Sequence, residues 1–269
     1  MPSTDTPIYA ATSAYAATSA YAATSAYAAT SAYAATSAYA ATSAYASTAT
    51  ATATVDSAPT GARIPGRRLT ARVLPLLAEA ELLDSPAGWG AAATPAGSFR
   101  LEPVRLGRDL ELLAGWMNDP EVATYWELAG PAAVTAAHVR SQLDGNGHSI
   151  PCLGLLAGTP MSYWEIYRAD LDPLSRHYPA RPHDTGIHLL IGDGANRGRG
   201  LGTALLRAVA DLVLDNRPRC TRVIAEPDIR NTPSVSAFLS SGFRCSAEID
   251  LPGKRAALMI RERALRNLI

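Results

Sequence analysis

The residues best suited to chemistry lie in a glycine-rich stretch, Arg197-Gly-Arg-Gly-Leu-Gly202. A short apolar run, His188 to Ile191, precedes this stretch, and Thr203 to Leu214 follows with the spacing of an amphipathic helix. Glycine lets the backbone approach a ligand closely, and the first N–H groups of a helix are unpaired donors at the positive end of its dipole. The order of strand, glycine turn and helix start therefore predicts a phosphate site, made by Arg197, Gly198, Arg199, Gly200, Leu201, Gly202 and Thr203.

Two titratable residues, His188 and Asp228, stand at the ends of expected strands. His188 begins the apolar run, and Asp228 lies just past a buried-type strand expected over Thr221 to Glu226. If these two strands are parallel neighbours, a cleft between them could hold both side chains. The residues alone are compatible with one shared site but do not select it, because a histidine at a strand start is usually a structural residue and Asp228 could simply initiate the turn before the next helix.

The elements that would position this site begin at Phe99, where the composition changes. Phe99 to Leu106 alternates apolar and polar residues, which is typical of a half-buried strand. Asn231 to Gly242 predicts a helix capped by Asn231 or Thr232, with a proline in its first turn and a glycine at its end. The remaining expected elements are helices at Asp109 to Asn118 and Thr135 to Leu143, a hairpin of Leu153 to Leu156 with Pro160 to Arg168, and a last strand at Ala256 to Ile260. The fold class is α/β (α+β), with a mixed central sheet flanked by helices.

The chain before this domain has a different composition. Residues 1–50 repeat AATSAY with a tyrosine at every sixth position, a period that matches neither a helix nor a known solenoid. Residues 51–98 are rich in proline, glycine and alanine, as linkers are, with one short helix possible at Leu69 to Leu83, interrupted at Pro75. We expect a disordered tail, a linker and a domain over residues 99–269.

Composition excludes several function classes. Lys+Arg and Asp+Glu balance at 24 each, so net charge gives no sign of binding to nucleic acid or to an anionic membrane. The 3 cysteines are widely spaced, which argues against disulfides and zinc, and no apolar run reaches the roughly 20 residues of a membrane span. We expect a cytoplasmic monomer or homodimer without a metal.

Two motifs carry a resemblance to a known family. The string Arg197-x-x-Gly200-x-Gly202 resembles the pyrophosphate loop of the GNAT family of acyl-CoA-dependent N-acyltransferases, and the string from Asn231 to Gly242-Phe243 is similar to the family's later helix. The resemblance implies acyl-CoA as co-substrate, held by the glycine loop and Asn231. Where many members carry a tyrosine acid, this chain has Phe238, which cannot donate a proton. Any acid for the departing thiolate must be another residue or water.

A narrower resemblance covers most of the domain. The chain looks like the acyltransferases of hydroxamate siderophore pathways, which acylate the hydroxylamine nitrogen of N6-hydroxylysine or N-hydroxycadaverine. It implies that His188 contacts the substrate and that Asp228 acts as base. A carboxylate with a pKa of about 3.9 suffices, because a hydroxylamine is largely neutral near pH 7. The motifs concerned are Trp116-Met-Asn-Asp-Pro120, Trp126-Glu127, Tyr163-Trp164-Glu165-x-Tyr167, Asp184-x-Gly-Ile-His188 and Glu226-Pro-Asp228, from which we also expect substrate contacts by Trp126, Trp164 and Glu165.

Several alternatives remain open at this stage. The opening motif and the glycine loop also resemble aminoglycoside N-acetyltransferases, although a polycationic substrate calls for a cleft richer in carboxylates. A non-catalytic acyl-CoA-binding or scaffold protein is the alternative from another class, supported by the missing tyrosine. The sequence leaves the acyl group, acetyl or succinyl, and the choice between hydroxylysine and hydroxycadaverine undecided.

Overall fold

The computed structural model describes residue 83, residues 85–145 and residues 147–267. The repeats of residues 1–50, most of the predicted linker and nearly all of the helix expected at Leu69 to Leu83 lie outside these residues. Within the described part, no helix combines the length and the apolar character that crossing a membrane requires.

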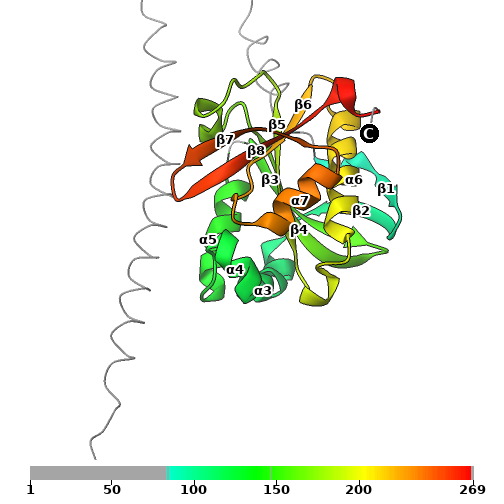
Figure 1. Cartoon of the computed structure of the whole chain (residues 1–269). Coiled ribbons are helices and arrows are strands. Elements are labelled where there is room, and N and C mark those ends of the chain that lie inside the picture. The colour runs from blue at the N-terminus through cyan, green and yellow to red at the C-terminus, as the bar shows by residue number, and fades with distance from the viewer. Residues whose placement is uncertain (1–82, 84, 146, 268–269) are drawn as a thin grey trace, which may run out of the picture. The chain divides into compact units, whose positions relative to one another are not determined.

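The described residues form one mixed sheet of eight strands in the order β1-β2-β3-β4-β5-β6-β8-β7 (Figure 1). Neighbouring strands are antiparallel, except that β5 and β6 are parallel. The predicted mixed sheet is therefore confirmed, and the two strands that precede Asp228 and carry His188 are parallel neighbours. The strands are β1 Ala91–Thr94, β2 Gly97–Pro103, β3 Ser149–Leu156, β4 Thr159–Arg168, β5 Thr185–Ile191, β6 Arg222–Ala225, β7 Arg244–Leu251 and β8 Lys254–Glu262.

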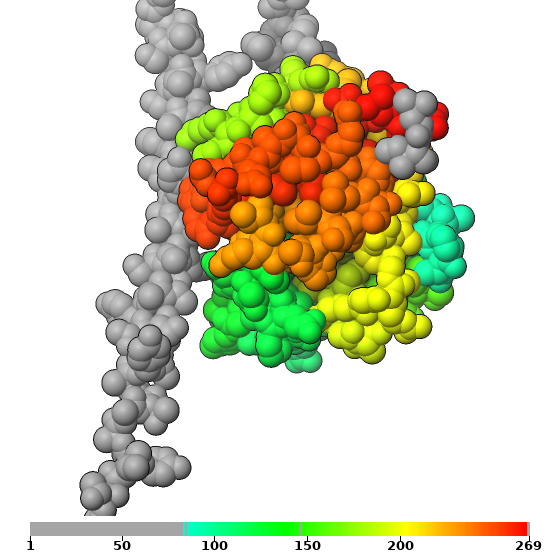
Figure 2. Space-filling view, in the orientation of Figure 1, coloured from blue at the N-terminus to red at the C-terminus, as the bar shows by residue number. Residues whose placement is uncertain are grey.

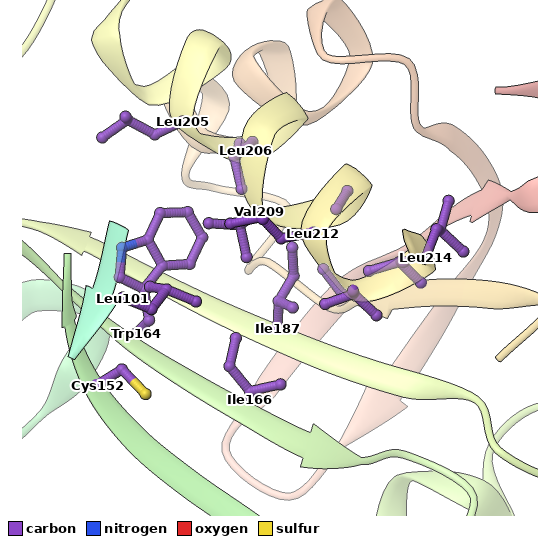
Figure 3. Close-up of a cluster of buried hydrophobic side chains, with 14 of the residues drawn as sticks. Leu101, Cys152, Trp164, Ile166, Ile187, Leu205, Leu206, Val209, Leu212 and Leu214 are labelled. Atoms are coloured by element: carbon purple, nitrogen blue, oxygen red, sulfur yellow. The ribbon is translucent and has the colours of Figure 1, made fainter. Parts of the chain in front are cut away.

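Helices cover both faces of this sheet. The predicted helices are confirmed as α3 Leu106–Met117, α5 Ala132–Leu143, α6 Leu201–Asn216 and α7 Thr232–Ser240. On one face, α6 buries Leu205, Leu206 and Val209 against the sheet, where they meet the indole of Trp164 (Figure 3). Side chains alternate along a strand, so Tyr163 and Glu165 point to the opposite face, where α5 lies. This second face carries the polar residues of the site.

The elements that were not predicted include two strands, one short helix and a 3-10 turn. Strand β1 and the 3-10 turn Pro86–Trp89 lie within residues 51–98, so the folded domain begins before Phe99, contrary to the linker prediction. The sequence of β1 is alanine-rich, and the strand exists because it pairs with β2. Strand β7 is largely exposed and so lacks an apolar face to detect. Helix α4, Pro120–Trp126, has only 7 residues, although Asp119 and Pro120 form a clear start signal.

The parallel pair opens part-way along its length. β5 pairs with β4 along all 7 of its residues, whereas its register with β6 comprises only Thr185 with Val223 and Gly186 with Ile224. Beyond Gly186, no residue in the described part of the chain pairs as a strand with the edge of β5 that faces β6. His188 lies in this open part, and Glu226 directly follows the end of β6. The two strands therefore cease to pair before they reach His188 and Glu226.

A buried ion pair holds the start of this opening. Asp184, which is fully buried, accepts hydrogen bonds from the Arg222 guanidinium, from the Tyr178 hydroxyl at 3.1 Å and from the Arg181 N–H at 2.8 Å. Arg222 belongs to β6, so the pair ties the entry of β5 to its parallel neighbour. The aspartate of the Asp184-x-Gly-Ile-His188 motif is thus a structural residue.

Candidate active site

The imidazole of His188 lies between two carboxylates. Its Nδ1 is 2.8 Å from Glu165 Oε2, and its Nε2 is 2.5 Å from Glu226 Oε1. Glu165 stands opposite His188 in the register of β4 with β5, and Glu226 reaches it across the opening from the end of β6. The His188 side chain is 34% exposed, whereas Glu165 and Glu226 are 8% and 7% exposed. The histidine is therefore the most exposed side chain of the three.

Glu165 is held by an unusually large set of donors. Its Oε1 lies 2.5 Å from His138 Nε2 and 2.6 Å from Gln142 Nε2, both on α5, and accepts the Tyr163 hydroxyl at 2.9 Å. A buried carboxylate requires such compensation, because burial without partners is costly. Glu165 thus links α5 through β4 to His188. The prediction that Glu165 belongs to the site agrees with this placement, whereas its proposed contact with substrate is untested.

Glu226 has its own supports on the other side of the histidine. Its Oε2 accepts the Tyr167 hydroxyl at 2.8 Å, and Lys254 Nζ lies 3.7 Å from its Oε1. The Tyr167 ring also lies against the imidazole of His188, with 4.9 Å between ring centroids. Gly186 makes this arrangement possible, because a Cβ atom there would lie 2.0 Å from Tyr167 Cζ.

These neighbours set the charges of the cluster. Burial by itself would lower the pKa of His188, but the charges and hydrogen bonds of Glu226 and Glu165 outweigh it and raise that pKa to about 10. Burial would raise the pKa of Glu226, but His188 and then Lys254 lower it to about 2. The pKa of Glu165 is likewise held well below its ordinary value, against burial, by His138 and His188. Near pH 7 the cluster holds two carboxylates around an imidazolium.

Aromatic rings lie beside the cluster. Trp126, the last residue of α4, makes edge contacts with Tyr163 at 5.5 Å and with His188 at 6.2 Å between centroids. Its partly buried position agrees with the predicted place of Trp126 in the site. Trp164 is different: it is fully buried on the α6 face, and its indole N–H donates to Ser162 Oγ at 2.9 Å. The strand turns Trp164 away from Glu165, so the structure does not bring it to the cluster, and its contact with substrate remains a prediction.

Asp228 lies 2 residues beyond Glu226 but does not join the histidine cluster. Its carboxylate accepts from the backbone N–H of Arg230 at 2.8 Å and from that residue's guanidinium at 2.7 Å. These bonds lower the pKa of Asp228, so it is ionised at neutral pH. The residue itself is 7% exposed, and it forms a bridge with Ala256 of β8. The structure thus brings His188 together with Glu226 and Glu165, and the base role of Asp228 remains a prediction.

The glycine loop has the shape that the sequence predicts. Gly198 and Gly200 adopt φ values of 67° and 78°, the left-handed region that glycine occupies readily, and Gly200 is the N-cap residue of α6. At Gly198, Gly200 and Gly202 an added Cβ atom would meet nothing within 4 Å. Gly202 has no positive φ, so neither backbone nor packing within the described chain requires glycine there. An open glycine at a helix start fits a ligand that approaches the backbone closely.

The two arginines of the loop differ in position. The guanidinium of Arg197 is bonded within the protein: it donates to the carbonyls of Ile191 and Gly192 and to the carboxylates of Asp119 and Glu121. Arg197 therefore fastens the loop to the end of β5 and to the start of α4. Arg199 is exposed. Of the two, Arg199 is the better placed to add charge for a phosphate group.

Two motif residues at α7, Asn231 and Phe238, have structural roles. Asn231 is the N-cap, and its Oδ1 accepts from the Ser234 N–H at 3.1 Å, as the sequence predicted for either Asn231 or Thr232. Phe238 is 4% exposed and packs on Phe243, with 5.0 Å between centroids. Phe238 therefore belongs to the core.

In Figure 2, α7 (orange) meets the α4–α5 segment (green) and the start of α6 (yellow) on one face of the molecule.

The capping role of Asn231 predicts a small stability effect. Asn231→Ala is expected to lower the free energy of unfolding by about 1 kcal/mol, whereas Asn231→Asp retains the cap. Urea unfolding of the three proteins measures this difference. Binding of coenzyme A to Asn231→Asp then tests the separate prediction that the residue contacts the donor. Unchanged affinity in that variant would leave Asn231 with a capping role alone.

Comparison with known proteins places this chain in a family. Residues 105–251 match the family model described as an acetyltransferase (GNAT) domain, which is more than half of the chain. The chain belongs to the GNAT acetyltransferase family. It is therefore an acyltransferase, of a family whose solved members include complexes with coenzyme A and acetyl-CoA. The fold and the donor implied by the glycine loop are confirmed at this level.

Similar proteins of known name share a narrow chemistry. Over 160 residues the chain is 39% identical to the lysine N-acyltransferase MbtK of Mycolicibacterium paratuberculosis, a match that covers 60% of this chain and 72% of the relative. It is 36% identical over 167 residues to the N(6)-hydroxylysine O-acetyltransferase of Escherichia coli, covering 62% and 52%. It is 34% identical over 154 residues to the hydroxyornithine transacylase SID3 of Ajellomyces capsulatus, covering 57% and 35%.

The solved structures with the same fold include proteins of other names than the sequence relatives. An uncharacterised protein from Bacillus halodurans is 32% identical with a TM-score of 0.62, covering 66% of this chain and 92% of that chain. The aminoglycoside acetyltransferase AAC(6')-Ib in complex with coenzyme A is 25% identical with a TM-score of 0.57, covering 63% and 98%. The structural likeness to the aminoglycoside enzyme is thus accompanied by lower sequence identity than the likeness to the lysine and hydroxylysine enzymes.

Sequence reasoning missed part of the cluster. Glu226, Tyr167, His138 and Gln142 were not assigned to the site, although each bonds to His188 or to one of its carboxylates. A signal existed for two of them, because Tyr167 and Glu226 stand in the same motifs as Glu165 and Asp228. For His138 and Gln142 no signal existed, because only tertiary packing brings α5 against β4.

Proposed function

We propose that this enzyme transfers an acyl group from acyl-CoA to the hydroxylamine nitrogen of N6-hydroxylysine or N-hydroxycadaverine, in hydroxamate siderophore biosynthesis. The observation that carries the proposal is His188, held between Glu165 and Glu226 in the opening beside β5. The names of the relatives, which act on lysine, hydroxylysine and hydroxyornithine, support an acceptor of this class. The acyl group is an acetyl or a succinyl group.

The donor is bound at the start of α6. The N–H groups from Arg197 to Thr203 hold the pyrophosphate, since the open glycines let it approach the backbone and the helix dipole favours negative charge. Arg199 adds positive charge, and the bound donor supplies the thioester. Backbone N–H groups along the unpaired edge of β5 then polarise the thioester carbonyl.

The acceptor lies in the cleft beside His188 and Trp126. Catalysis is mainly positioning: the neutral nitrogen is held against the carbonyl carbon, and its proton passes to a carboxylate as positive charge develops. Asp228 takes this proton. Because the phenyl ring of Phe238 has no proton to donate, the proton that the departing thiolate takes up comes from another residue or from water.

Removal of the proposed base tests the mechanism. Asp228→Ala is expected to lower the rate of acyl transfer to N6-hydroxylysine by about 10²–10⁴-fold, the usual contribution of a general base. Binding of coenzyme A should stay nearly unchanged, because the glycine loop is untouched. Asp250→Ala, at an exposed position of β7, is the matched control. Normal turnover by Asp228→Ala would refute the assignment of the base.

A substrate panel tests the function itself. Acetyl-CoA and succinyl-CoA are each supplied with N6-hydroxylysine, N-hydroxycadaverine and an aminoglycoside such as kanamycin. We expect product formation with one of the hydroxylamines. Turnover of the aminoglycoside alone would instead support the second candidate, which the structural likeness to AAC(6')-Ib favours. Binding of acyl-CoA without turnover on any acceptor would support a scaffold role.

A further inference from the structure

The hydrogen bonds around His188 determine where its protons lie. Both ring nitrogens face a carboxylate oxygen, and an ionised carboxylate can only accept. Each of the two contacts between a ring nitrogen and a carboxylate oxygen therefore contains one proton. Without that proton, the lone pair of the nitrogen would repel the negative charge of the carboxylate. Imidazole is a stronger base than a carboxyl group, with an ordinary pKa of about 6.5 against about 4.3. Both protons consequently belong to the histidine.

The surroundings reinforce this assignment. Glu165 has no need of a proton of its own, since its other oxygen already accepts from His138, Gln142 and Tyr163. The second oxygen of Glu226 is satisfied by the Tyr167 hydroxyl. The titratable groups that face the histidine or its two carboxylates come from several neighbouring elements: Tyr163, Glu165 and Tyr167 of β4, His138 of α5, Asp172 before the turn Pro173–Arg176, Glu226 after β6 and Lys254 of β8.

We propose that Glu165 and Glu226 are positioning residues that keep His188 as an imidazolium, so that the histidine cannot accept a proton and the site admits only nucleophiles that are already neutral. This inference rests on the proposed function. It assigns to the two glutamates the discrimination between a hydroxylamine and its parent amine, which differ by a single oxygen atom.

The discrimination follows from the charge of the nucleophile. A lysine side chain has a pKa of about 10.4, so at pH 7 only about one molecule in 2,500 carries the neutral amine that can attack a thioester. An enzyme with a free imidazole could remove the proton of the bound ammonium. Here His188 is already protonated, and the carboxylates of Glu165, Glu226 and Asp228 all have lowered pKa values. A hydroxylamine is largely neutral and needs no such base.

The charge of His188 can be measured without substrate. In the protein labelled with ¹⁵N-histidine, both ring nitrogens of His188 should show the imidazolium signal from pH 6 to pH 8, with assignment from His188→Gln. Glu165→Gln, which keeps the shape of the side chain, should lower the pH at which this signal is lost by at least about one unit. Glu226→Gln should act in the same direction from the other side. Glu111→Gln, at an exposed position of α3, should change nothing.

Kinetics provide the second measurement. With lysine as acceptor, kcat/KM of the unaltered enzyme should rise about tenfold per pH unit from pH 7 to 9, following the neutral amine. In Glu165→Gln the preference for N6-hydroxylysine over lysine should begin to fall at a pH at least about one unit lower than in the unaltered enzyme, since a neutral His188 can then accept a proton. A merely structural role for Glu165 would lower both activities equally and leave this ratio unchanged.

The outcomes separate this inference from the proposed function. A neutral His188 ring at pH 7 in the unaltered protein would overturn the inference, even if N6-hydroxylysine is acylated well. An unchanged ratio together with an unchanged titration in both glutamine variants would also overturn it. Failure to acylate any hydroxylamine, with His188 nevertheless an imidazolium, would refute the proposed function and leave the charge assignment standing.

Discussion

Gly186→Ala is expected to lower acyl transfer by about 10²-fold or more while leaving a folded protein. A Cβ atom at this position would lie 2.0 Å from Cζ and 2.3 Å from Cε1 of Tyr167, inside the ring rather than against a flexible end. The ring is 6% exposed and packed in the core cluster that contains Ile224 and Leu258, so it has no free space to move into. Displacement of a catalytic group by about 1 Å can reduce a rate by about 10²-fold.

We expect the loss of activity because the displaced Tyr167 ring in turn displaces His188. The tyrosine hydroxyl holds Glu226 at 2.8 Å, and its ring lies on the imidazole. Moving the ring therefore disturbs both the carboxylate and the histidine. Overpacking of this kind also destabilises the fold by about 1–3 kcal/mol. Acyl-CoA binding at the start of α6 is remote from the change and should persist.

The measurements are turnover with N6-hydroxylysine, binding of coenzyme A and the free energy of unfolding. Gly107→Ala is the matched control, because a Cβ atom at that helical position meets nothing within 4 Å. The control should retain full activity. Full activity in Gly186→Ala would show that acyl transfer does not depend on the position of the Tyr167 ring. That result would contradict the role assigned to the ring.

Gly202→Val is expected to weaken acyl-CoA binding at least about tenfold, which corresponds to about 1.4 kcal/mol. The valine side chain would project from the first turn of α6 into space that no atom of the described chain occupies. Its effect on the fold should be small, because glycine is the poorer helix former by a few tenths of a kcal/mol. A loss of affinity therefore reports on a ligand that uses this space.

A graded series makes the test sharper. Gly202→Ala should weaken binding less than Gly202→Val, since its side chain is smaller, and should raise stability by up to about 1 kcal/mol. Isothermal titration with coenzyme A measures affinity. Gly115→Ala in α3, where a Cβ atom also meets nothing within 4 Å, should leave the affinity unchanged. Equal affinity in all four proteins would place the pyrophosphate away from the α6 start.

The sequence by itself determined most of the helices and strands of this protein. Periodic apolar residues located α3, α5 and α6, and the strands around the site, because burial against a sheet leaves a regular pattern along the chain. The glycine loop by itself predicted a phosphate site, and its resemblance to the GNAT pyrophosphate loop indicated acyl-CoA as the donor. The Asn231 cap and Phe238 were also readable, because each depends on local spacing or on residue type alone.

Only the tertiary structure decided how the site is assembled. Trp164 and Glu165 are adjacent in sequence, yet the strand sends one into the core and the other into the cluster, and motif reasoning could not separate them. Strand β1 and the α5 residues His138 and Gln142 acquired their roles from pairing and packing partners far along the chain. The charge of His188 likewise depends on two carboxylates that approach from β4 and from the end of β6. Such long-range contacts leave no periodic trace in the sequence, and so only the folded protein reveals the carboxylate–imidazolium–carboxylate arrangement.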